Sequence, residues 1–77
     1  MSDLDRIRWH CRRGLLELDL ILDRFNERYL ERLSTEDRKT FESLLEEDDN
    51  DLLDLVMGRA ELASERYRKI LNMLQAP

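Results

Sequence analysis

Cysteine, proline, glycine and histidine are scarce in this sequence of 77 residues, which holds one Cys, one Pro, two Gly and one His. A single cysteine cannot form an internal disulfide, so the sequence does not predict a disulfide-stabilised secreted domain. Two isolated glycines do not make a phosphate-binding loop, which excludes the common nucleotide-binding motifs. One histidine and one cysteine are also too few for the usual zinc ligand patterns. We therefore expect no metal centre.

Long hydrophobic runs are missing as well. None approaches the ~20 apolar residues that a membrane-spanning helix requires, so we expect no membrane insertion. At 42% apolar residues the chain is nevertheless too hydrophobic for a disordered protein. With few helix breakers and no strand-like alternation, the sequence predicts a single all-α domain over residues 1–77.

The net charge is −5, because 18 acidic residues outweigh 13 Lys and Arg. That balance argues against nucleic acid as a partner, since phosphate binding requires a clustered basic face. The charge is unevenly distributed: residues 1–14 carry a net charge of +2, and residues 36–54 carry −7. Such a molecule can be oriented electrostatically on a protein of complementary pattern. The alternative, that these are ordinary solvated helix faces, stays open on charge alone.

Helical periodicity predicts a compact five-helix bundle with short connections. Ser2 begins the first helix, which ends before Gly14, and the second helix is predicted over residues 15–33. The residues of these helices expected to face the core are Leu4, Ile7, Cys11, Leu18, Ile21, Leu22, Phe25, Tyr29 and Leu33.

Three shorter helices are predicted to follow. Ser34 begins one, Asp49 or Asn50 caps another that ends at Gly58, and the last is predicted over residues 64–75 with Ser64 as its cap. Their core-facing residues are expected to be Phe41, Leu44, Leu45, Leu52, Leu53, Leu55, Val56, Met57, Tyr67, Ile70, Leu71 and Leu74.

The sequence does not favour an enzyme. His10 and Cys11 are adjacent, so on a helix their side chains diverge by roughly 100° and cannot form a nucleophile–base pair. Cys11 is predicted to be a small core residue and His10 a surface residue. An all-α chorismate mutase would need converging cations on a long, unbroken first helix. Gly14 interrupts that helix, and Glu17 places an anion beside the arginines.

The most informative cluster is residues 12–17, RRGLLE. If Gly14 joins two helices, Glu17 lies in the first turn of the second, where the helix dipole favours a carboxylate that could bond Arg13 or free backbone N–H groups. Trp9 lies near these arginines, and Arg and Trp are enriched at interface hot spots. The pattern therefore fits a contact surface for a partner, and it also fits an ordinary helix corner with a glycine at its end.

Residues 6–19, RIRWHCRRGLLELD, resemble the signature of the small succinate dehydrogenase flavinylation factors, whose hallmark is Arg-Gly-x-x-Glu. Residues 41–52, FESLLEEDDNDL, are similar to the same family's Leu-Leu-Glu…Asp-x-Asp-Leu segment. The resemblance covers nearly the whole chain. Two positions depart from the family pattern: Asn50 stands where many members have proline, and Leu55 where a tryptophan is common.

This resemblance implies a five-helix bundle that is not an enzyme. It implies an assembly factor that binds the flavoprotein subunit of succinate dehydrogenase, and often that of fumarate reductase, and promotes covalent FAD attachment to a histidine of that subunit. FAD would belong to the client, with no cofactor held stably by this chain. We expect a bacterial, cytoplasmic protein that is a monomer when free. The implied contact residues are Trp9, Arg12, Arg13, Gly14 and Glu17, with Arg6 and Asp19 as further candidates.

A helical adaptor or homodimeric bundle with no flavoprotein client is the alternative that the sequence leaves open. A stable homodimer that captures no flavoprotein would favour it.

Overall fold

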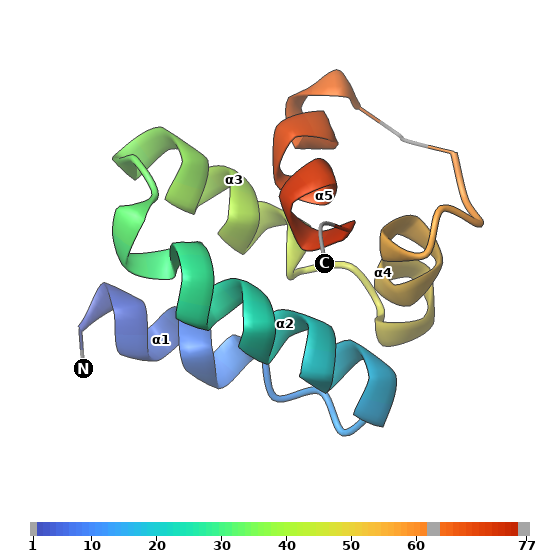
Figure 1. Ribbon diagram of the computed structural model, residues 1–77, viewed down its shortest axis with the longest axis horizontal. Helices are drawn as coiled ribbons and strands as arrows, with labels where there is room; N and C mark the ends of the chain where they lie inside the picture. Colours follow the sequence, from blue (N-terminus) through green and yellow to red (C-terminus); the bar gives the residue numbers. More distant parts are fainter. Residues whose placement is uncertain (1, 62–63, 76–77) are drawn as a thin grey trace.

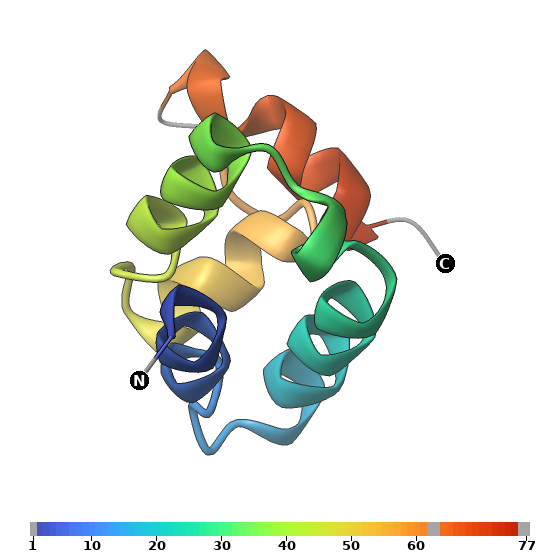
Figure 2. The same cartoon turned by 90° about the vertical axis from the view of Figure 1, so that its left-hand side faces the viewer.

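The computed structural model describes residues 2–61 and 64–75. In these residues the chain is helical and contains no strand, which confirms the all-α prediction. Its elements are α1 (Asp3–His10), α2 (Leu16–Tyr29), a 3₁₀ turn (Leu30–Arg32), α3 (Thr35–Leu44), α4 (Asp49–Val56), a second 3₁₀ turn (Glu65–Tyr67) and α5 (Arg68–Gln75). Figure 1 shows α2 running back beside α1, and Figure 2 shows α3 and α5 on the other side of the molecule, with α4 between.

Serine side chains begin three of the helical segments, as their positions predict. The Ser2 hydroxyl accepts a hydrogen bond from the Asp5 N–H at 3.1 Å, and the Ser34 hydroxyl accepts one from the Asp37 N–H at 3.0 Å. Ser64 caps the turn before α5. These bonds satisfy N–H groups that have no partner within the helix.

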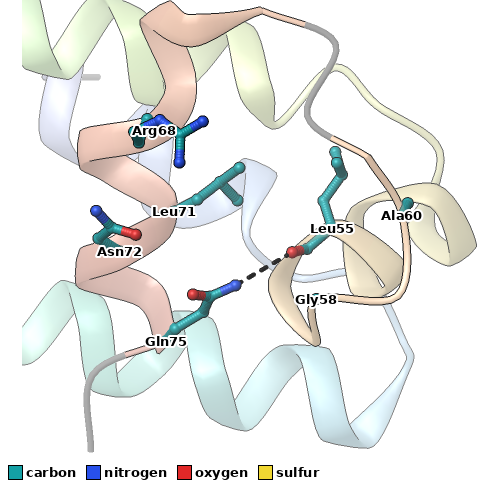
Figure 3. A pocket seen from close by; sticks show the side chains of 7 residues that line it. All are labelled: Leu55, Gly58, Ala60, Arg68, Leu71, Asn72 and Gln75. Atoms are coloured by element: carbon teal, nitrogen blue, oxygen red, sulfur yellow. Dashed lines mark hydrogen bonds between the residues drawn. The ribbon is translucent and has the colours of Figure 1, made fainter.

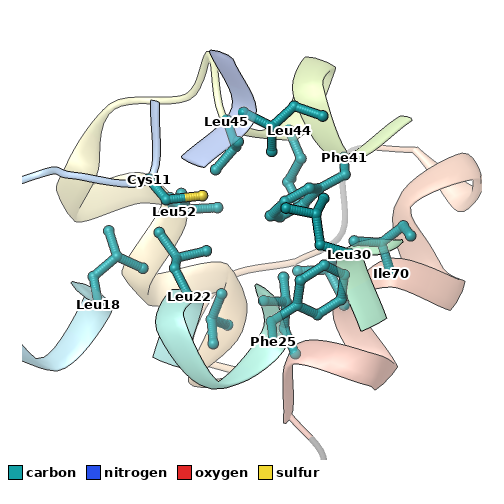
Figure 4. Close-up of a cluster of buried hydrophobic side chains, with 14 of the residues drawn as sticks. Cys11, Leu18, Leu22, Phe25, Leu30, Phe41, Leu44, Leu45, Leu52 and Ile70 are labelled. Atoms are coloured by element: carbon teal, nitrogen blue, oxygen red, sulfur yellow. The ribbon is translucent and has the colours of Figure 1, made fainter. Parts of the chain in front are cut away.

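The core lies between α2 and the other four helices (Figure 4). Phe25 of α2 packs against Phe41 of α3 with ring centroids 4.5 Å apart, and Leu30 is fully buried beside them. Every α-helix contributes to this cluster, since each presents apolar residues at helical spacing. The buried residues are Ile7, Cys11, Leu18, Leu22, Phe25, Leu30, Leu33, Phe41, Leu44, Leu45, Leu52, Val56, Ile70, Leu71 and Leu74.

Two predicted helices are subdivided in the structure. The helix predicted over residues 15–33 is α2 followed by a 3₁₀ turn, and the helix predicted over residues 64–75 starts with a 3₁₀ turn before α5. Tighter turns of this kind are common at helix ends. The first of them directs Leu30 into the core, a residue that the helical pattern did not mark as buried.

The region around α4 corrects two further expectations. Asp48, rather than Asp49 or Asn50, precedes the helix as its cap residue, and its side chain makes no capping hydrogen bond. Met57 is not a core residue but is 50% exposed. The reason is that α4 ends at Val56, and Gly58 then turns the chain away with a positive φ of 75°.

Candidate interaction surface

The connection between α1 and α2 lies at the lower edge of the molecule in Figure 2. Together with the first two residues of α2 it forms what we call the corner (residues 11–17). Helix α1 ends as the N–H of Cys11 donates to the carbonyls of Ile7 and Arg8. Gly14 then adopts a φ of +81°, a left-handed conformation that glycine reaches without strain. A Cβ atom built there meets nothing within 4 Å, so the backbone of Gly14 is open to an approaching molecule.

Arg13 fastens the corner to the segment between α3 and α4. Its Nε donates to Oδ1 of Asp49 at 2.7 Å, and its Nη1 donates to the carbonyl oxygens of Leu45 and His10 at 2.5 and 3.1 Å. Its Nη2 donates to the carbonyl of Glu47. Only 14% of the Arg13 side chain is exposed. The guanidinium thus lies between the negative, C-terminal end of α3 and a carboxylate in the first turn of α4.

Asp19 holds the corner from the other side. Its Oδ1 accepts a hydrogen bond from the Arg13 N–H at 2.9 Å, and its Oδ2 accepts one from the Gly14 N–H at 3.2 Å. Leu15, the cap residue of α2, makes no side-chain capping bond. The half-buried carboxylate of Asp19 therefore satisfies N–H groups of the chain that leads into the helix.

Three of the predicted contact residues project from this framework into solvent. The side chains of Trp9, Arg12 and Glu17 are exposed, with Trp9 at 62%, and none forms a hydrogen bond or ion pair with residues 2–61 or 64–75. Leu16 and Leu20, on the outer face of α2, are exposed as well, Leu16 at 72%. An interface combines apolar residues of this kind with a charged rim.

The structure separates the predicted residues into two groups. Arg13 and Asp19 are engaged within the chain, and the carboxylate that pairs with Arg13 is Asp49 rather than Glu17. Arg6 is also engaged, because it forms ion pairs with Asp3 at 3.3 Å and with Glu42 at 2.9 Å. The hydrogen bond and charge of Glu42 raise the pKa of Arg6.

The side chains of His10 and Cys11 lie in different environments, as predicted: His10 is exposed, whereas Cys11 is 3% exposed. Burial raises the pKa of the Cys11 thiol above its ordinary value and outweighs the hydrogen bond to Asn26 and the charge of Arg13, which lower it; the carboxylates of Asp23 and Asp19 add smaller effects in the raising direction. At neutral pH the thiol is therefore protonated, and the thiol is the unreactive form of cysteine.

Cys11 should accordingly resist thiol reagents in the folded protein. We expect iodoacetamide at neutral pH to label it at least about tenfold more slowly in the native chain than in urea, because labelling requires both opening and deprotonation. Mass spectrometry of time points measures both rates. Equal rates would place Cys11 on the surface.

A hollow lies between α4 and α5, away from the corner, with a volume of about 140 Å³ (Figure 3). Its lining includes Arg68, whose guanidinium is already paired with Glu65 at 2.6 and 2.9 Å. Gln75 closes one side through a hydrogen bond to the Leu55 carbonyl.

In the described part of the chain, acidic, His and Cys side chains form no cluster fit for a metal ion. No described helix is long and apolar enough to cross a membrane.

Residues 5–77 match the sequence model of the family described as "Flavinator of succinate dehydrogenase". The chain belongs to this family. Within the flavinator family, it is 55% identical over 71 residues to the FAD assembly factor SdhE of Vibrio vulnificus strain CMCP6, an alignment that covers 92% of this chain and 83% of that one.

More distant family members align over a similar length. The FAD assembly factor SdhE of Ralstonia nicotianae is 44% identical over 75 residues, covering 92% of this chain and 79% of the relative. The protein of the same name from Coxiella burnetii is 39% identical over 70 residues, covering 91% and 85%. These flavinator relatives are named as assembly factors rather than as catalysts.

Asp49 is the residue at this surface whose role the sequence analysis missed. The sequence predicts Asp49 or Asn50 as a helix cap, whereas the Asp49 carboxylate binds Arg13 from 36 positions along the chain. The acidic run after α3 was the available signal, because an arginine with little exposed surface needs an anion. Asp19 carried a local signal: a carboxylate early in α2 can reach back to free N–H groups.

Proposed function

We propose that this chain is an assembly factor that binds the flavoprotein subunit of succinate dehydrogenase and promotes the covalent attachment of FAD to it. Membership of the flavinator family supports this function. The observation that carries it is the surface at the corner and the adjoining end of α1, where Trp9, Arg12 and Glu17 are exposed and unpaired within the described residues while Arg13 is held by hydrogen bonds.

The arrangement suits a docking role. Covalent flavinylation joins the flavin to its host histidine, and these groups supply the chemistry. A helper needs to favour the client conformation in which they face each other, which it does by binding that conformation more tightly than others. A corner fixed by hydrogen bonds loses little conformational entropy on docking, and this strengthens such differential binding.

The finer features of the function rest on the family resemblance. We propose that FAD stays with the client, that the flavoprotein subunit of fumarate reductase is a second client, and that the free chain is a monomer in the bacterial cytoplasm. Light scattering tests the monomer. Pull-down of the fumarate reductase subunit with tagged chain tests the second client.

The main function is tested by covalent FAD incorporation. In cells that lack their own factor, we expect this chain to raise the flavin fluorescence of the denatured succinate dehydrogenase subunit on a gel several-fold, and to co-purify with that subunit. Gly14→Arg is the matched negative variant. An arginine has open space there, and the left-handed backbone costs about 1–2 kcal/mol, so the variant should fold but not dock.

An unchanged fluorescence together with failure to capture the subunit would contradict the proposed function. If Gly14→Arg supported incorporation as well as the wild-type chain, the backbone of Gly14 would not lie in the interface.

A further inference from the structure

Asp19 occupies an unusual position for a candidate contact residue. Each of its carboxylate oxygens already accepts a hydrogen bond from the backbone of the corner, Oδ1 from Arg13 and Oδ2 from Gly14. Its own N–H donates to the Leu15 carbonyl at 2.9 Å, the first hydrogen bond of α2. Asp19 therefore ties the corner directly to the start of the helix that carries Glu17.

The two hydrogen bonds require two acceptor oxygens, which a carboxylate provides. Asparagine offers one acceptor oxygen and an NH₂ group, so at position 19 its NH₂ would face the N–H of either Arg13 or Gly14. One of these donors would then lose its partner inside the protein. The backbone of Gly14 would then be less restrained, and because glycine is conformationally permissive it would readily leave its left-handed conformation.

Asp19 and Asp49 bind different parts of Arg13. Asp49 binds the guanidinium of Arg13, whereas Asp19 binds the N–H of the same residue. Arg13 is thus fixed at its side chain and at its backbone by carboxylates from different helices. Trp9 and Arg12 precede this fixed point, and Glu17 follows it.

We propose that Asp19 is a positioning residue for client docking: it acts through the backbone of Arg13 and Gly14, which it holds in the binding-competent conformation, and it does not touch the client. This role rests on the proposed function. Its consequence is kinetic. If Asp19 maintains the competent conformation, its loss lowers the fraction of molecules able to bind. The apparent association rate then falls in proportion to this fraction. Loss of a direct contact instead raises the dissociation rate.

The experiment measures both rates with purified succinate dehydrogenase flavoprotein subunit, immobilised for biolayer interferometry at a temperature where circular dichroism shows every variant folded. We expect Asp19→Asn to lower the association rate at least fivefold and to change the dissociation rate less than twofold. Glu17→Gln, a direct contact in the proposed interface, should mainly raise the dissociation rate.

Asp23→Asn is the matched control for charge, since Asp23 lies on the same helix, is exposed, and has no ion pair within the described residues. It removes the same charge and should leave both rates within twofold. Amide hydrogen exchange of the free chain gives a readout without the client. At least one of the N–H groups of Arg13 and Gly14 should exchange at least tenfold faster in Asp19→Asn, and those of the core of α2 should not.

Unchanged association in Asp19→Asn would overturn the positioning role, as would a change confined to the dissociation rate or amides of the corner that exchange as in the wild type. Each of these results leaves the proposed function standing, because the wild-type chain still binds. A wild-type chain that does not bind the subunit would overturn the proposed function and this role together.

Discussion

Arg13→Ala is expected to lower the free energy of unfolding by about 2–4 kcal/mol. The substitution removes the partner of Asp49 and leaves the carbonyls of His10, Leu45 and Glu47 without their donor. The estimate stays below that of a fully buried ion pair because Asp49 is 41% exposed and water can reach it. For a domain of this size the midpoint of thermal unfolding should fall by roughly 10–25 °C.

Arg12→Ala is the matched control, since Arg12 is the neighbouring arginine and its side chain has no ion pair or hydrogen bond in residues 2–61 and 64–75. Its stability should change by less than about 0.5 kcal/mol. Arg13→Lys should fall between the two, because an ammonium group cannot reproduce the planar fork. Circular dichroism melts of the three variants test the series. Equal melting of Arg12→Ala and Arg13→Ala would contradict the structural role of Arg13.

Glu17→Gln is expected to reduce covalent FAD incorporation at least about tenfold while the protein stays folded. The carboxylate is exposed and unpaired in the described part of the chain, so its loss should cost the free protein at most about 0.3–1 kcal/mol through the helix dipole. In a docked complex the cation or N–H group that it meets would be left unpaired, which typically costs about 2–5 kcal/mol of binding. In-gel flavin fluorescence of the client measures the effect.

Glu36→Gln provides a closely matched comparison. Glu36 is exposed and occupies the second position of α3, as Glu17 does in α2, so both substitutions remove the same favourable charge from a helix start. The start of α3, which includes Glu36, lies beyond the far end of α2, away from the corner (Figure 1). We expect it to leave incorporation within twofold of the wild type. Similar losses in both variants would show that helix stability, and not docking, explains the effect of Glu17.

These variants separate roles that residue type alone does not distinguish. A loss of FAD incorporation in an Arg13 variant would not show that Arg13 touches the client, because Arg13 supports the whole corner. Stability must therefore be measured beside incorporation. Trp9, Arg12 and Glu17 should affect incorporation without unfolding, and Arg13 should affect both.

Local sequence patterns predict the helices, their serine caps and most of the core. These features depend on local order: an apolar residue every three or four positions places Leu18, Leu22 and Phe25 on one face of a helix, whatever that face later packs against. The motif around Gly14 also indicated the family and the place of the proposed interaction surface, because a helix end is encoded within a few residues.

The packing of the helices, and not the local sequence, distinguishes the two adjacent arginines of the corner. Arg12 and Arg13 are neighbours of the same chemistry, and local pattern treats them alike. Arg13 is largely covered and hydrogen-bonded because the fold brings Leu45 and Asp49 next to it, from 32 and 36 positions along the chain. The same dependence on distant neighbours exposes Met57 and engages Asp19 with the corner. Helical periodicity reports which side of a helix is apolar, whereas the partner of a charged group is set by where the remaining helices pack.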